Sequence, residues 1–132
     1  MSAGAALQAA IVRALEPVDG LSGIYDGPPA RAAYPYVAVD ARDERDWGHK
    51  TGAGREVLAA VTVWDDVPAR LEALIEEVEP ALAAIGPVEG WQLVTLNFVK
   101  RGLKRDVAGP WAGQMDFRAR LLAAPEYTEE SE

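Results

Sequence analysis

Two strand-like runs joined by a polar, glycine-bearing connection constrain the fold of this chain most. In residues 36–42 a small or branched apolar residue recurs at positions 37, 39 and 41, and in residues 55–65 at positions 57, 59, 61 and 63. A period of two is typical of β-strands. The connection, residues 43–54, is rich in charge and suits a hairpin whose glycines take positive φ. This block predicts a long β-hairpin with a mobile, charged loop.

The second run carries apolar side chains on both of its faces. The residues of the two faces are, in turn, Val57, Ala59, Val61 and Val63, and Leu58, Ala60, Thr62 and Trp64. A strand without a polar face is expected to be shielded from solvent on both faces. We therefore expect helices on one side of it and a neighbouring subunit on the other.

Two amphipathic helices are predicted around this hairpin. The first covers about residues 3–15, with Ser2 as its N-cap and an apolar residue at every fourth position. The second begins after Asp66, which we expect to be its N-cap, and runs to about residue 85 with a wide apolar face. Pro80 lies inside it and is expected to kink or divide it.

A second pair of strands follows the second helix. Alternation predicts strands at about residues 91–101 and 111–124, with a polar connection between them, and residues 21–33 suit an irregular connection rich in turn-forming residues. The resulting order is α-β-β-α-β-β. It predicts an α+β domain: a four-stranded, mostly antiparallel sheet with both helices on one face.

The composition fits one globular domain. The chain has 132 residues, of which 49% are hydrophobic and 26% charged, and we expect residues 1–124 to form the domain. Residues 125–132 are acidic and are expected to be a disordered tail. The net charge is −8, which disfavours specific nucleic-acid binding. We find neither a signal peptide nor a run long enough to span a membrane, so assembly in the cytoplasm is expected.

The sequence offers no pattern typical of an enzyme. There is no cysteine and only one histidine, His49, so zinc-type ligand sets are lacking. His49 with Asp46 would be the only acid–base pair worth testing, but a plain loop histidine is the simpler interpretation. Residues 51–54 do not follow a phosphate-binding pattern, because a strand and not a helix comes after them. We expect no catalytic, cofactor or metal site.

Charged and aromatic side chains in two regions are the candidate interface instead. Lys100, Arg101, Lys104 and Arg105 form a basic cluster, with Arg118 and Arg120 on the neighbouring strand. In an acidic protein such a cluster is a natural partner for an acidic patch on another copy. The second region is the hairpin loop, where an exposed tryptophan would suit an interface. Its candidate residues are Trp47, His49, Lys50 and Arg55.

Several segments, in order, resemble the tail-terminator and tail-completion proteins of siphophages and of phage-like gene transfer agents. The resemblance covers nearly the whole chain, and no single segment carries it alone. The segments are Ala6-Leu7-Gln8-Ala9-Ala10-Ile11, Ile24-Tyr25-Asp26-Gly27, Tyr34-Pro35-Tyr36-Val37, Trp47, Lys50-Thr51-Gly52-Ala53-Gly54-Arg55-Glu56, Val63-Trp64 and Met115-Asp116-Phe117-Arg118-Ala119.

This resemblance implies a structural virion protein without catalytic residues. Members of the family form a ring, usually a hexamer, on the head-proximal end of the tail tube. The ring ends tube polymerisation and joins the head connector, and DNA passes through its lumen without specific binding. The implied partners are other copies of the chain, the tail-tube protein and the head–tail connector or stopper.

Two alternatives remain open from the sequence. The chain could be another neck component, such as a connector, a stopper or a tail-tube subunit, because these share small α+β designs and ring symmetry. It could also be a small ligand-binding domain or enzyme with a site around His49, which predicts a concave pocket.

Overall fold

The computed structural model describes residues 1–27, 29–107 and 109–124. Its elements are α1 (Ala3–Leu15), β1 (Gly23–Asp26), β2 (Tyr36–Asp46), β3 (Gly54–Asp65), α2 (Pro68–Ala83), β4 (Trp91–Arg105) and β5 (Trp111–Ala123). The acidic tail predicted at 125–132 lies outside the described residues. Neither helix of the described part is long and apolar enough to cross a membrane.

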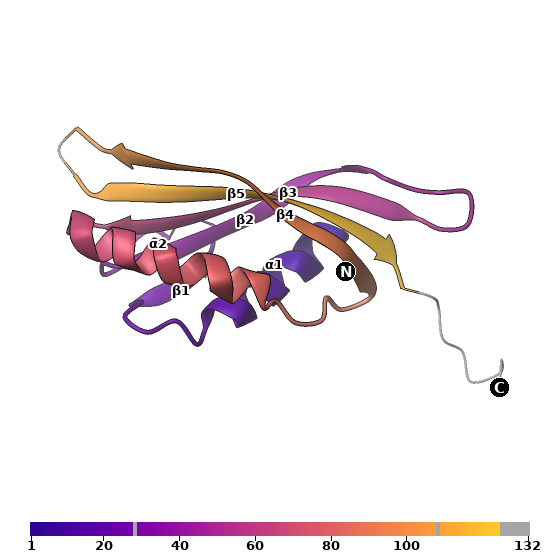
Figure 1. The fold of residues 1–132 in the computed structure, drawn as a ribbon, viewed down its shortest axis with the longest axis horizontal. Coiled ribbons are helices and arrows are strands. Elements are labelled where there is room, and N and C mark those ends of the chain that lie inside the picture. The colour runs from indigo at the N-terminus through magenta and orange to yellow at the C-terminus, as the bar shows by residue number, and fades with distance from the viewer. Residues whose placement is uncertain (28, 108, 125–132) are drawn as a thin grey trace.

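One open, twisted sheet carries both helices on the same face (Figure 1). The strand order is β1-β2-β3-β5-β4. All neighbours are antiparallel except β1 and β2, which are parallel. The prediction of an α+β fold with two helices on one face is confirmed. The prediction of four strands is wrong, because the sheet has five.

The missed strand is β1, inside the segment predicted to be irregular. It has four residues, too few for an alternating pattern, and its register runs from Gly23 opposite Tyr36 to Asp26 opposite Val39. Parallel strands are not joined by a tight hairpin, so no turn motif next to β1 indicates that it pairs with β2. It is pairing with β2, and not the local sequence, that makes this segment a strand.

The core lies between the sheet and the helices. From the sheet it takes one alternating face of β2, β3 and β5, and from the helices the stripes predicted from their periodicity. Ser2 caps α1 as predicted, accepting a hydrogen bond from the amide of Ala5 at 3.1 Å. α2 runs through Pro80 without interruption. Gly113 lies beneath this helix, where a Cβ would collide with Ile75, so α2 can approach β5 closely.

The start of α2 differs from the prediction. The N-cap position is Val67, not Asp66, and its side chain makes no capping bond. Asp65, fully buried at the end of β3, accepts a bond from the Val67 amide at 3.2 Å. It also binds Arg70 through two bonds of 2.6 Å. The carboxylate one residue earlier therefore joins strand to helix, and Asp66 lies in solvent.

The β2–β3 hairpin ends in an arm, which we define as residues 47–54, and the tip of this arm projects past the rest of the sheet (Figure 1). The base of the arm is still bonded to β5, because the Ala123 amide donates to Ala53 O at 2.9 Å. The Trp47 amide donates to Gly54 O at 3.0 Å and the His49 amide to Gly52 O at 2.8 Å, so the predicted loop shrinks to a two-residue turn. Its glycines do not take positive φ, contrary to the prediction. Gly54 is instead required by space, because a Cβ there would collide with the Trp47 carbonyl.

A buried glutamine bonds the outer edge of β2 beyond β1. β1 ends opposite Val39, and beyond it the outer edge of β2 is bonded by the side chain of Gln8 from α1. The amide nitrogen of Gln8 donates to Val39 O at 3.1 Å and to the carboxylate of Asp26, and its oxygen accepts from the Ala41 amide at 2.9 Å. The bulge between Asp40 and Asp43 follows directly. Gln8 thus holds β2 where the strand bends.

Replacing Gln8 by leucine is expected to lower the free energy of unfolding by about 2 kcal/mol, since the Ala41 amide would be buried without a partner. Chemical denaturation monitored by circular dichroism measures this loss. Gln114→Leu is the matched control, because Gln114 is exposed and bonds only to Asp116 among the described residues. A control that loses as much stability as the Gln8 variant would contradict the assignment.

Candidate assembly interface

The sheet face opposite the helices, here the open face, is covered by no helix of the described residues (Figure 1). Strand alternation and register place these residues on it: Tyr36, Ala38 and Asp40 of β2, Glu56, Leu58, Ala60, Thr62 and Trp64 of β3, Gln114, Asp116, Arg118 and Arg120 of β5, and Lys100 and Lys104 of β4. The β3 residues among them are all half-buried, although no helix covers them. Apolar side chains on an uncovered face suit a contact with another molecule.

Stacked aromatic rings extend this face towards β1. The ring of Tyr36 stacks on Tyr34 at 5.8 Å and on Trp64 at 6.4 Å between centroids, and Tyr25 meets it edge-on. Burial raises the pKa of the Tyr36 phenol, and the neighbouring phenols of Tyr34 and Tyr25 raise it further. Tyrosine and tryptophan are enriched at protein interfaces. The sequence does not mark these four residues as one group, because they come from three separate segments.

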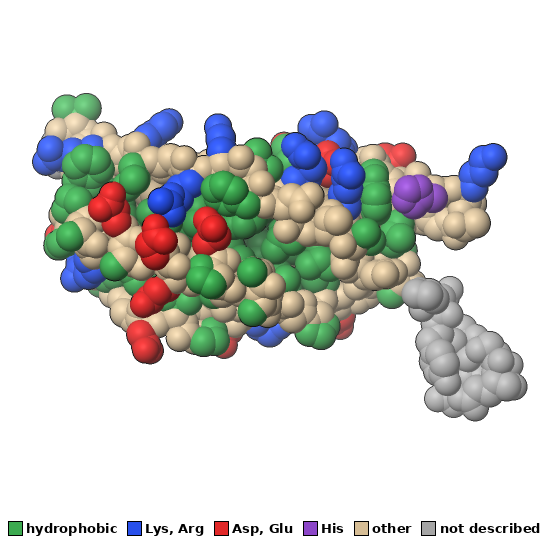
Figure 2. Space-filling view, in the orientation of Figure 1, with side chains coloured by type: hydrophobic (Ala, Val, Ile, Leu, Met, Phe, Trp, Pro, Cys, Tyr) green, Lys and Arg blue, Asp and Glu red, His purple; other side chains and the backbone are tan. Residues whose placement is uncertain are grey.

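Basic side chains surround the apolar part of the open face. Glu56 lies between Arg120 at 3.1 Å and Arg45 at 3.8 Å, and Lys100 lies 3.8 Å from Asp116. Arg118 and Lys104 form no ion pair within the described residues. In Figure 2 the blue side chains project from the upper edge of the molecule, which is the open-face side. The open face therefore presents unneutralised positive charge.

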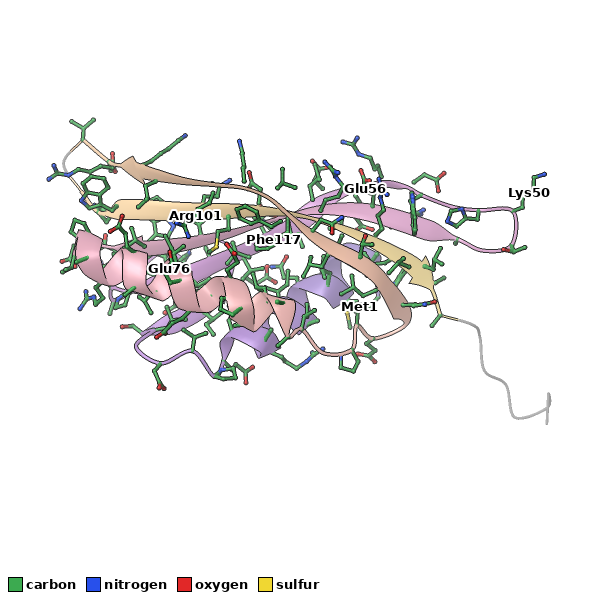
Figure 3. All side chains as sticks on the ribbon, viewed as in Figure 1. Met1, Lys50, Glu56, Glu76, Arg101 and Phe117 are labelled. Atoms are coloured by element: carbon green, nitrogen blue, oxygen red, sulfur yellow. The ribbon has the colours of Figure 1, made fainter. Side chains whose placement is uncertain are left out.

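Strand alternation divides the predicted basic cluster in two. Lys100, Lys104, Arg118 and Arg120 share the open face, whereas Arg101 and Arg105 point to the helix side of β4. There Arg101 pairs with Glu76 of α2 at 3.2 Å (Figure 3), and Arg105 lies 5.5 Å from the Trp111 ring. Residues 102–105, expected in a connection, are part of β4.

The four candidate residues of the hairpin are also separated. Trp47 is held on the open-face side, with its ring 5.5 Å from the Arg120 guanidinium and 4.8 Å from the His49 ring. Arg55 points the other way, towards Asp46 at 3.4 Å and Glu44 at 4.0 Å. Lys50 lies at the tip of the arm (Figure 3). Trp47 therefore stiffens the arm as well as exposing part of its ring.

The outer surface of α2 has the opposite charge. Its exposed residues include Glu72, Glu76, Glu77 and Glu79. Figure 2 shows red side chains gathered over this helix. Of these four, only Glu76 is paired within the described residues. The subunit is thus basic on its open face and acidic along α2.

The arrangement around His49 does not resemble a catalytic site. Its ring is exposed and contacts Trp47, and the nearby Asp46 carboxylate accepts the Gly48 amide and pairs with Arg55. The part of the chain that the structure describes contains no cluster of three potential metal ligands. What the surface can do chemically is bind another protein through apolar, aromatic and charged contacts.

Comparison with known proteins identifies the family of this chain. A family model described as tail completion protein gp17 matches residues 3–122. The chain belongs to this family. No curated protein sequence matches it.

A solved structure of a whole particle contains a chain similar to this tail completion protein. One chain of a structure described as the virion of a native gene transfer agent particle superposes with a TM-score of 0.77. The two share 27% sequence identity, and the match covers 92% of this chain and 98% of that one. The family and this similarity indicate a structural protein of a phage or phage-like particle that assembles with other virion proteins. The resemblance inferred from the sequence is confirmed.

Proposed function

We propose that this tail completion protein is a tail terminator. In this proposal copies of the chain form a ring, a hexamer as the family resemblance implies, on the head-proximal end of the tail tube. The ring stops further addition of tube subunits and offers its other side to the head connector or stopper. The role requires no catalytic residue and no cofactor.

The observation that carries the proposal is the unpartnered open face in a chain whose fold matches a virion protein over nearly its whole length. A ring of identical subunits needs two different, complementary patches on each subunit. The open face is one such patch, and the acidic surface of α2 has the charge expected of the other. The tip of the arm, residues 47–54, projects from the domain (Figure 1), and in this proposal it contacts an adjacent ring in the tail or neck.

The net charge of −8 suits the passage of DNA through the proposed ring. A lumen of the same sign as the phosphate backbone repels it and gives it no fixed site. In this proposal DNA slides through without being recognised.

Deleting the gene in the producing cell tests the proposal. We expect tails of irregular, excessive length that do not join heads, because nothing ends tube growth, and we expect the wild-type gene supplied in trans to restore uniform tails. Electron microscopy of the particles measures tail length and head attachment. Detached tails of normal length would indicate a connector or stopper, and a complete absence of tails would indicate a tube subunit; either result would contradict a terminator.

A further inference from the structure

We propose that the outer ridge of α2 in one copy docks into the open face of the next copy, and that this contact closes the ring. The inference rests on the proposed ring and assigns the surfaces that build it. It follows from three features: the shape of the open face, the composition of the ridge, and their charges.

The open face is hollowed rather than flat. Two adjoining depressions of about 520 and 620 Å³ share Asp116 in their linings. Thr62 and Trp64 line the first, and Leu58 and Ala60 line the second, so the floor is largely apolar. The charges of the lining are mixed. The basic residues are Arg42, Lys100, Arg101, Lys104, Arg105 and Arg118, and the acidic residues are Asp40, Asp43, Asp106 and Asp116, which leaves an excess of positive charge around the first depression. A groove with an apolar floor and a charged rim suits an amphipathic helix.

The ridge of α2 is narrow, apolar and acidic at its sides. Ala69, Ala73 and Pro80 recur at helical spacing on the side opposite the buried stripe, and all are exposed. Small side chains let a helix approach another surface closely. Glu72 and Glu77 lie on opposite flanks of this ridge, also exposed. The ridge therefore matches the apolar floor of the groove, and its acidic flanks suit Lys104 and Arg118, which form no ion pair within the described residues.

The dimensions and positions of the two surfaces also agree. α2 has 16 residues and is about 24 Å long, and the 12 residues of β3 span about 40 Å. The helix fits within the face. The helix layer and the open face lie on opposite sides of the subunit (Figure 1). A contact between opposite, unlike surfaces is heterologous, and such contacts generate closed rings when the rotation between subunits closes.

A second copy suits the groove better than the other acidic occupants do. DNA would place phosphates against Asp116 and Glu56, whose carboxylates lie among the basic residues, and would leave the apolar floor unmatched. The acidic residues 126–132 of the same chain supply charge but no apolar ridge. Burying the basic face between subunits would also leave the rest of the ring surface acidic, as an unobstructed DNA path requires.

Charge reversal tests the contact. One variant reverses the groove, Lys104→Glu with Arg118→Glu, and another reverses the ridge, Glu72→Lys with Glu77→Lys; Glu76 is left intact because it pairs with Arg101. Each variant alone should form fewer rings by at least about ten-fold, because like charges then face each other. Rings are counted by electron microscopy of the full-length protein with the tail-tube protein. Circular dichroism checks that each variant is folded.

Rescue is the decisive result. Combining all four substitutions in one chain should restore rings, and so should mixing the two variants, because every groove in an alternating ring then faces a ridge of opposite charge. If residues 126–132 or DNA occupied the groove instead of α2, reversing the charge of the ridge would not restore ring formation in the groove variant. Folded variants that assemble like the wild type, or a combined variant that does not recover, would overturn the proposal.

Cysteine pairing gives a test that does not depend on charge. The chain contains no cysteine, so Thr62→Cys with Ala73→Cys introduces the only two thiols, one in the groove and one on the ridge. Mild oxidation of the assembled protein should yield a covalent ladder ending at the ring size. The control, Ala30→Cys with Ala73→Cys, should yield none, since Ala30 lies in an exposed loop outside the groove. No ladder from the first pair would overturn the contact, whereas wild-type protein that neither forms rings nor caps tubes would overturn the proposed function itself.

Discussion

Replacing Gly48–Ala53 by Asn-Gly is expected to leave the protein folded and to abolish head joining. Trp47 and Gly54 are hydrogen-bonded across the hairpin, so a two-residue turn can close the shortened arm at this pair. The removed residues are exposed and none belongs to the hydrophobic core. The one bond that they make to another strand, from the Ala123 amide to Ala53 O, lies at the very end of β5. If the arm reaches an adjacent ring, its loss removes that contact. The measurement is the fraction of tails attached to heads when the variant replaces the wild-type protein in the producing cell.

The matched control keeps the length of the arm. Replacing only Lys50-Thr51 by Asn-Gly preserves the hairpin pairs at Trp47 and His49 and changes only the turn. Comparing the two variants separates the reach of the arm from the chemistry of its tip. Thermal unfolding should be nearly unchanged in both. A shortened variant that joins heads at the wild-type frequency would show that the arm does not make the proposed contact.

Replacing Asp65 by asparagine is expected to lower the free energy of unfolding by about 3 kcal/mol. The carboxylate is fully buried and its two bonds to Arg70 measure 2.6 Å, so the substitution removes a bidentate, charge-assisted pair that joins β3 to α2. The control is Asp66→Asn. Asp66 is 62% exposed and lies 3.4 Å from the same arginine, and its replacement should cost less than about 1 kcal/mol. Equal losses from the two variants, measured by chemical denaturation, would contradict this account.

The contribution of Asp65 to the free energy of unfolding should also decrease as the pH falls. The hydrogen bond from Arg70 lowers the pKa of the Asp65 carboxyl, and this effect exceeds the opposing effect of burial. The unfolded chain binds this proton at a pKa of about 3.9. The stabilisation is therefore complete above that pH and is lost as the pH falls from about 4 through the lower pKa of the folded state. The difference in unfolding free energy between wild type and Asp65→Asn should shrink in acid and stay constant between neutral pH and about pH 5.

Much of the fold is predictable because its signals are local. α1 carries its cap and its apolar stripe within 13 residues, and the alternation of β3 and β5 marks their buried faces directly. β1 could not be predicted, because only its parallel pairing with β2 makes it a strand. That Asp65, and not Asp66, bonds the start of α2 could not be predicted either, because it depends on which carboxylate contacts Arg70 in the folded chain.

The candidate interface was predictable in composition but not in geometry. The sequence marked Lys100, Lys104 and Arg118 as basic residues near one another. It could not place Arg105, because the strand was expected to end before residue 102, and the face of Arg101 depends on the bulge between Phe98 and Lys100, which no sequence pattern shows. The extra length of β4 decides which side chains share a face. The complementary ridge of α2 needed the tertiary fold, which places helix and groove on opposite sides of the subunit.

Negative-stain electron microscopy of the purified protein, alone and mixed with its tail-tube protein, shows whether the chain forms the proposed terminating ring. We expect closed rings of one size that sit at one end of each tube and stop its growth, so that tubes become shorter as the protein is added. Protein that remains monomeric and leaves the length of the tubes unchanged, or that polymerises into tubes itself, would contradict it.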